Sequence, residues 1–89
     1  MLTETVRIEA SEGLHMRPAG VLSKEMGAFQ SKVEILFGEK RINAKSVMMI
    51  MGACIKSGAE VTFEIDGEDE ADALEKLHAL IQTNFGEAV

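Results

Sequence analysis

The 89-residue sequence has no tryptophan or tyrosine, a single cysteine and a single proline. Without tryptophan or tyrosine it has almost no side chains on which nucleic-acid bases could stack. Basic residues are also few, with 9 lysines and arginines against 15 acidic residues and a formal charge of −6 at pH 7. Because affinity for nucleic acids comes largely from clustered Lys and Arg on the phosphates, we expect no nucleic-acid partner.

The single cysteine and the short apolar runs limit disulfide, metal and membrane chemistry. Cys54 has no second cysteine with which to form an internal disulfide, and no Cys/His cluster has zinc-ligand spacing. We expect Cys54 to be a small, semi-buried residue in a reducing compartment. The longest apolar run, VMMIMGACI, is far shorter than the ~20 residues that span a bilayer, and the first ten residues lack a signal-peptide pattern. The expectation is a cytoplasmic protein with no membrane insertion, no metal and no cofactor.

The length fits one domain, residues 1–89, that buries only roughly 60–65 % of its surface. An enclosed active site has little room in such a chain. A functional site, if there is one, is therefore expected to lie at the surface and to consist of few residues.

Alternating apolar residues predict four strands, each with one apolar face. The first covers residues 2–10, and the KVEILFGEKRINA stretch is a hairpin in which Gly38 supplies the turn. The fourth is EVTFEID, with Val61, Phe63 and Ile65 on the apolar side. One-sided strands of this kind indicate an antiparallel sheet covered on one face.

Apolar residues at helical spacing predict three helices. The first begins at Pro18 and carries its apolar stripe to Phe29, since proline is tolerated in a first turn. Ser46 is the expected N-cap of a short helix that stops at Gly52, and Asp69 that of an amphipathic helix running toward Phe85. The predicted order is β-α-β-β-α-β-α, an α+β fold with a four-stranded sheet and helices on one face.

The stretch EGLHMRPAG places a histidine where the first helix begins. First-turn backbone N–H groups lack intrahelical partners and attract anions. A neutral imidazole nitrogen at His15 can attack phosphorus. The planar guanidinium group of Arg17 can donate two hydrogen bonds to phosphate oxygens, and Pro18 fixes the first turn of the helix. The plainer alternative is that His15 is a polar loop residue and Arg17 a solvated charge.

Three segments in order, GLHMRPAG, NAKSVMMIMG and GAEVTFEIDGEDEADALEKL, resemble the HPr family of the bacterial phosphoenolpyruvate-dependent sugar phosphotransferase system. The resemblance covers essentially the whole chain. It implies an HPr-like open-faced β-sandwich whose antiparallel sheet is packed on one face by three helices. It also implies a carrier rather than an enzyme, in which His15 takes a phosphoryl group on Nδ1 from phosphorylated enzyme I and passes it to IIA domains of sugar permeases. Arg17 and the backbone amide of Met16 would hold the phosphate.

The resemblance gives Ser46 a regulatory role as well as a capping one. In Gram-positive members the matching serine is the substrate of an HPr kinase/phosphorylase, and the neighbouring apolar residues also meet a catabolite-control repressor. A phosphate there would add ~1.5–2 negative charges at a helix start. The residues implied in partner binding are Val47, Met48, Met51, Gly20 and Lys24.

Several positions depart from the family's usual residues. Glu12 replaces a small Ser or Asn, and a carboxylate there is expected to repel the phosphoryl group, which would shorten its lifetime or alter the preference for partners. Met16 is bulkier than the usual Ala or Thr, and Gly20 weakens the helix. His78 is expected to be an ordinary surface or boundary residue of the last helix.

Three other functions remain as alternatives, and a monomer is expected in each case. One is a regulatory HPr-like protein that acts mainly through phosphorylated Ser46 and a repressor, although relatives of that kind replace the histidine. Another is a carrier for a nitrogen-related or dihydroxyacetone branch. The last is a histidine phosphatase, for which the local sequence offers only Glu12 as a second acid–base group.

Overall fold

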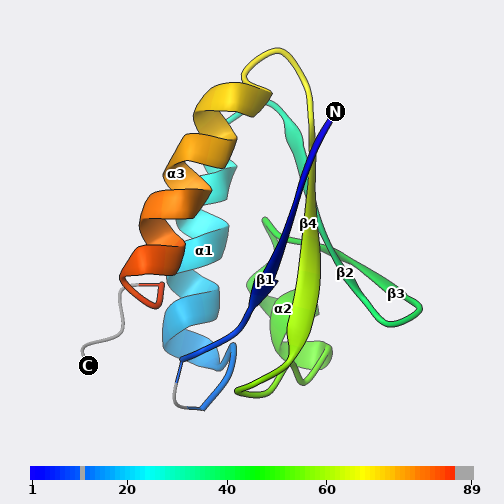
Figure 1. The fold of residues 1–89 in the computed structure, drawn as a ribbon, viewed down its shortest axis with the longest axis vertical. Helices are drawn as coiled ribbons and strands as arrows, with labels where there is room; N and C mark the ends of the chain where they lie inside the picture. Colours follow the sequence, from blue (N-terminus) through cyan, green and yellow to red (C-terminus); the bar gives the residue numbers. More distant parts are fainter. Residues whose placement is uncertain (11, 86–89) are drawn as a thin grey trace.

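The computed structural model describes residues 1–10 and 12–85 (Figure 1). Its elements follow the predicted order β-α-β-β-α-β-α. They are β1 (Leu2–Arg7), α1 (Met16–Gly27), β2 (Lys32–Phe37), β3 (Lys40–Asn43), α2 (Val47–Gly52), β4 (Glu60–Asp66) and α3 (Glu70–Gln82).

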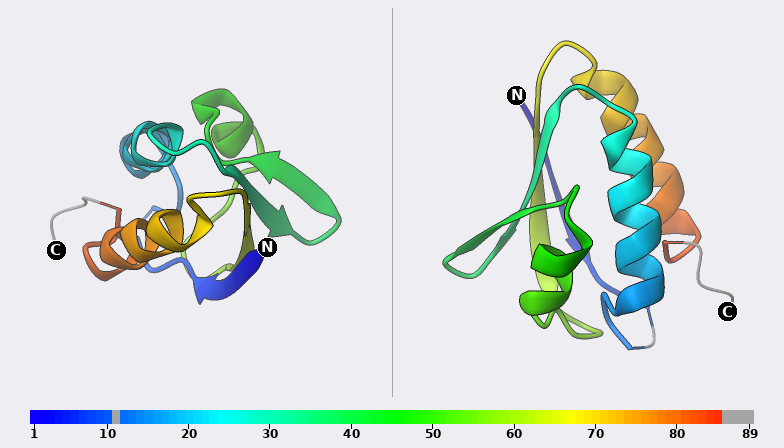
Figure 2. Two further views of the ribbon diagram at one scale, coloured as in Figure 1. Left: turned by 90° about the horizontal axis from the view of Figure 1, so that it is seen from above. Right: turned by 180° about the vertical axis from the view of Figure 1, so that it is seen from behind.

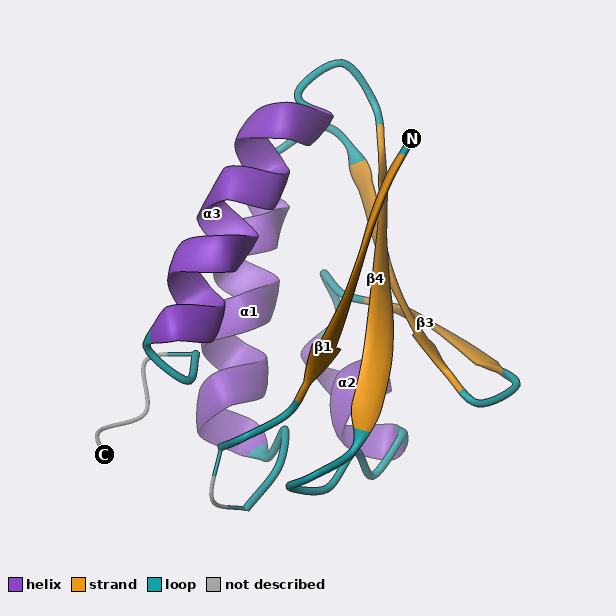
Figure 3. Cartoon of the chain, in the orientation of Figure 1, coloured by secondary structure: helices purple, strands orange, loops and turns teal. Residues whose placement is uncertain are grey.

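The four strands form one antiparallel sheet in the order β1-β4-β2-β3. Helices α1 and α3 lie side by side against one face of this sheet, and α2 lies beside α1 (Figures 2 and 3). The predicted α+β open-faced sandwich is therefore confirmed.

The core lies between this sheet face and the helices. Val33 and Ile35 of β2 and Phe63 of β4 are almost completely buried, as the alternation predicts. Leu22 and Leu77 meet them from α1 and α3 and are fully buried. The uncovered face is polar, and there Arg41 of β3 donates to the carboxylates of Glu34 and Glu64 at 2.6 and 2.8 Å.

Three strand and helix ends differ from the sequence predictions. α1 begins at Met16 instead of Pro18, which places Pro18 inside the first turn. β1 ends at Arg7 instead of residue 10, because the ladder with β4 ends at the Arg7–Glu60 pair. The chain beyond it still alternates, and Ile8 is fully buried. α3 ends at Gln82, before the predicted end near Phe85. The Phe85 amide donates to the Leu80 carbonyl at 2.7 Å, and the Phe85 side chain is buried.

Cys54 is exposed, so the expectation of a semi-buried residue was wrong. It directly follows the C-cap of α2, with a backbone φ of 55°. Cys54 is thus the first residue beyond the helix cap, where the chain takes the left-handed conformation that commonly ends a helix, and it does not belong to the buried face of α2.

Asp69 is the N-cap of α3 by position, as predicted, but its carboxylate does not cap the helix. It instead accepts hydrogen bonds from the backbone amides of Gln30 and Ser31 at 2.8 and 2.9 Å, and from the Ser31 hydroxyl. The start of α3 is thereby tied to the loop between α1 and β2.

Within residues 1–10 and 12–85, no helix has both the length and the apolar character needed to cross a bilayer.

Candidate functional site

The loop before α1 is fixed in place by its contact with the segment that follows α2. The Leu14 amide donates to the Ile55 carbonyl at 2.9 Å, and the Gly13 amide donates to Ala10 at 2.9 Å. Gly13 has a φ of +72°, and a Cβ on it would lie 2.2 Å from the Ile55 carbonyl oxygen. Only glycine fits this approach, so residues 13 and 14 hold the next residue, His15, in a defined place.

His15 is the N-cap of α1, in an extended conformation with φ −82° and ψ −168°. Its carbonyl accepts from the Ala19 amide at 2.9 Å, and its side chain makes no capping hydrogen bond. The first-turn amides of Met16 and Arg17 have no intrahelical acceptor, as at any helix start. The imidazole, which is 34 % exposed, thus lies beside N–H groups suited to an anion.

The residues around His15 lie as the sequence predicts for a helix start. Pro18 is buried in the first turn, where its missing N–H costs nothing. Met16 and Arg17 are exposed, and Met16 is 67 % exposed despite its apolar side chain. Glu12 also approaches the imidazole, with Oε2 4.0 Å from Nε2.

Ser46 is the N-cap of α2, as predicted. Its hydroxyl oxygen accepts from the Met49 amide at 3.2 Å, which satisfies one of the unpaired N–H groups of that helix. Of the residues that follow, Ile50 is buried and Val47 is half-buried, whereas Met48 is 85 % exposed. Met49 and Met51 are partly exposed as well.

The two predicted sites lie at the same end of the molecule. α1 packs against α2, and the start of α1 and the whole of α2 lie at the bottom of Figure 1. Further along α1, Gly20 is half-buried and Lys24 is exposed. The exposed methionines of both helices therefore lie at the same end of the molecule as His15 and Ser46, and flexible apolar side chains of this kind are typical of a surface that binds several partners.

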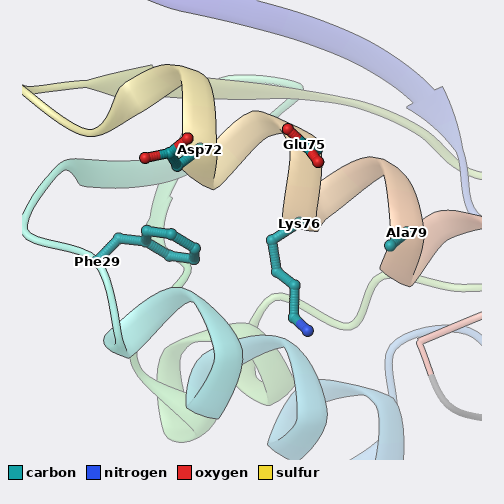
Figure 4. Close-up of a pocket in the computed structure, with 5 residues that line it drawn as sticks. All are labelled: Phe29, Asp72, Glu75, Lys76 and Ala79. Atoms are coloured by element: carbon teal, nitrogen blue, oxygen red, sulfur yellow. The ribbon is translucent and has the colours of Figure 1, made fainter.

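A separate hollow of about 300 Å³ lies between α3 and the chain that follows α1, at the far end of α1 from His15 (Figure 4). Phe29, Asp72 and Lys76 line part of it. It contains no residue of either predicted site. Over the described part of the chain, no group of acidic, cysteine and histidine side chains is arranged to hold a metal.

Sequence reasoning missed the closeness of Gly13 to Ile55 and the approach of Glu12 to Nε2 of His15. The sequence indicates Glu12 as a charge near the expected phosphate and as a possible acid–base group, but not which ring nitrogen it approaches. The Gly13 contact joins positions about forty residues apart, for which the local pattern carries no signal. The three-residue spacing from Glu12 to His15 across a glycine could have indicated that the two side chains meet.

Comparison with known proteins gives a consistent result. The family model described as "PTS HPr component phosphorylation site" matches residues 2–83. The chain is 40 % identical over 82 residues to the HPr-like protein Crh of Bacillus subtilis, covering 92 % of this chain and 96 % of Crh. It is 42 % identical over 83 residues to the phosphocarrier protein HPr of Haemophilus influenzae, covering 93 % and 98 %. A crystal structure of HPr from Thermoanaerobacter tengcongensis superposes over 100 % of both chains with a TM-score of 0.93 and 35 % identity.

Proposed function

The chain belongs to the HPr family of the phosphotransferase system, a phosphocarrier family, and on that premise we propose that it carries a phosphoryl group on His15. One observation carries the proposal. His15 stands at the N-cap of α1 with a side chain that does not cap the helix, beside first-turn amides that have no intrahelical partner.

The proposed step is a transfer from phosphorylated enzyme I. The lone pair on Nδ1 of His15 forms a bond to phosphorus, and the bond between phosphorus and the donor breaks with its electron pair left on the donor. Transfer to a IIA domain repeats this exchange with His15 as the donor. Such a relay needs positioning and charge stabilisation more than an enclosed pocket, which suits a surface site on a small domain.

Arg17, Met16 and Pro18 support this step in separate ways. The Arg17 guanidinium provides a planar fork for two phosphoryl oxygens. The Met16 amide provides a fixed donor at the helix start, and buried Pro18 sets the direction of the first turn. The chain acts here as a stoichiometric monomeric carrier, without turnover of its own.

Ser46 is proposed as a regulatory phosphorylation site for a kinase of the HPr kinase/phosphorylase type. Its hydroxyl is at a helix start beside Met48, which is 85 % exposed. A phosphate at that place would change an apolar partner surface into a charged one and favour a different partner, such as a catabolite-control repressor. Val47, Met48, Met51, Gly20 and Lys24 are the proposed partner contacts.

The test is mass spectrometry of the intact protein after incubation with enzyme I, magnesium and phosphoenolpyruvate. We expect one phosphoryl group, labile in acid and stable in alkali, on the native chain. His15→Ala should carry none. The chain has two histidines, so His78→Ala is the matched control and should be phosphorylated like the native protein.

No phosphate on any of the three, with an enzyme I that is active on another HPr, would contradict the sugar-relay function. The same incubation with an enzyme I of the nitrogen-related branch then tests that alternative. Phosphate on His15→Ala would contradict the assignment of the site.

A further inference from the structure

We propose that Glu12 is a positioning residue for His15, an inference that rests on the proposed phosphoryl transfer. Its carboxylate favours the imidazole tautomer with the proton on Nε2. That tautomer leaves the lone pair on Nδ1, where phosphorus is to be bound.

The first support is the position of the two side chains. Glu12 Oε2 lies 4.0 Å from Nε2 of His15, and Nε2 is the ring nitrogen that the proposed transfer does not use. Between them, Gly13 and Leu14 are buried and tied by backbone hydrogen bonds to Ala10 and Ile55. The short fixed segment therefore directs both side chains to the same part of the surface.

The second support is the hydrogen-bonding capacity of the two groups. An ionised carboxylate only accepts hydrogen bonds, and a neutral imidazole has one N–H and one bare nitrogen. Facing a carboxylate, Nε2 is therefore the nitrogen that keeps the proton. At 4.0 Å the pair is not yet a direct hydrogen bond, but the Glu12 side chain is 77 % exposed and has room to rotate closer.

This arrangement affects both halves of the proposed transfer. When His15 accepts, the Nδ1 lone pair forms the new bond to phosphorus while Nε2 retains its proton, so no proton has to move. Once Nδ1 carries the phosphoryl group, the nearby carboxylate favours the protonated, cationic ring. When the bond to phosphorus breaks, its electron pair returns to Nδ1, and the cationic ring is the better leaving group. Glu12 thus makes phosphohistidine a more reactive donor and a shorter-lived one.

Among the residues that the structure describes, two cations also lie near this loop. Arg17 is on α1 two residues after His15, and the Lys56 backbone packs against Gly13. Both are cations and neither can accept a proton from Nε2–H at neutral pH. Glu12, whose Oε2 lies 4.0 Å from Nε2, can accept that proton in a hydrogen bond, so its removal should change the tautomer.

The direct test is nitrogen-15 NMR of the His15 ring in the unphosphorylated protein at a pH where the ring is neutral. The native chain should show Nε2 predominantly protonated. Glu12→Gln should move the population toward the other tautomer by about twofold to fivefold, since exposed charge pairs are weak. Glu9→Gln removes another exposed carboxylate from the preceding segment and should leave the His15 signals as they are.

The second measurement is the lifetime of the phosphorylated form at neutral pH. Glu12→Gln should lengthen it about twofold to fivefold relative to the native chain and to Glu9→Gln. Identical tautomer populations in Glu12→Gln and the native protein, or identical lifetimes, would overturn the inference. Since the NMR measurement needs no phosphate, a failure of His15 to be phosphorylated would remove the proposed function while the effect of Glu12 on the ring was still measured.

Discussion

Cys54 has a backbone conformation that is rare for a residue with a side chain. Its φ of 55° is left-handed, and its amide donates to the Met51 carbonyl at 3.2 Å to close the end of α2. Helices commonly end with glycine at this position, because a Cβ in the left-handed region costs roughly 1–2 kcal/mol. The sequence instead led us to place the stop at Gly52, which is the last residue of the helix.

Replacing this cysteine with glycine should stabilise the protein. Removing the Cβ relieves the unfavourable left-handed conformation, but part of this gain is offset because glycine loses more backbone conformational entropy on folding. For Cys54→Gly we expect a net gain of about 0.5 kcal/mol, or roughly 2–4 °C in melting temperature. Thermal unfolding followed by circular dichroism measures it. Cys54→Ala keeps the Cβ and removes the thiol, so a gain of equal size in that variant would show that the backbone conformation is not the cause.

At the scale of elements, Asp69 determines how α3 joins the rest of the fold. Its carboxylate accepts hydrogen bonds from the Ser31 hydroxyl and from the Gln30 and Ser31 amides. The Ser31 hydroxyl, followed by the Gln30 amide, lowers the pKa of Asp69 below its ordinary value of 3.8. A carboxyl whose pKa is lower in the folded state stabilises the fold while it is ionised.

Asp69→Asn should therefore lower the melting temperature by several degrees at pH 7. Because the folded pKa is depressed, the contribution of Asp69 is fully present above the ordinary value and is lost as the pH falls through the lower folded value. The difference between variant and native protein should shrink on acidification below about pH 4. Melting curves from pH 7 to pH 2 measure this change.

The control is Asp72→Asn, which removes an exposed acidic residue from the same first turn of α3. It keeps the bonds to Ser31 and Gln30 and should show a smaller effect. A constant difference between Asp69→Asn and the native protein across this pH range would contradict the assignment.

Ser46, Asp69 and Gly13 show which features of the structure could be predicted from the sequence and which could not. Local periodicity was enough for the seven elements, and the serine before an apolar run was enough for the Ser46 cap. The sequence pattern also predicted that Asp69 stands at a helix start. It did not predict the hydrogen bond between Asp69 and Ser31, which is 38 residues away. Backbone packing between distant segments, as at Gly13 and Ile55, has no local pattern, because it depends on how the elements come together.

At the scale of the molecule, the fold separates the residues that stabilise it from those proposed to act on partners. Leu22 of α1 and Ile50 of α2 are completely buried, whereas Met16 and Met48 on the same two helices are 67 % and 85 % exposed. The exposed methionines of these two helices lie at the end of the molecule where α1 starts and where α2 lies (Figure 1). A charge added there should affect binding more than folding.

This separation predicts how phosphorylation of Ser46 would act on His15. Ser46→Asp adds a negative charge beside Met48 but keeps a side chain that accepts from the Met49 amide. We expect phosphorylation of His15 by enzyme I to slow by about three- to tenfold, since charges at the rim of an interface mainly change the association rate. Melting temperature should stay within a degree or two of the native value, because aspartate is as good an N-cap as serine.

Ser46→Asn is the matched control, since it also caps the helix but adds no charge. It should be phosphorylated at the native rate. Initial rates measured at several salt concentrations give a further criterion, because an electrostatic effect weakens as salt screens it. Equal slowing in Ser46→Asn and Ser46→Asp, independent of salt, would show that the serine acts through local helix structure, and the proposed regulation by charge would then be wrong.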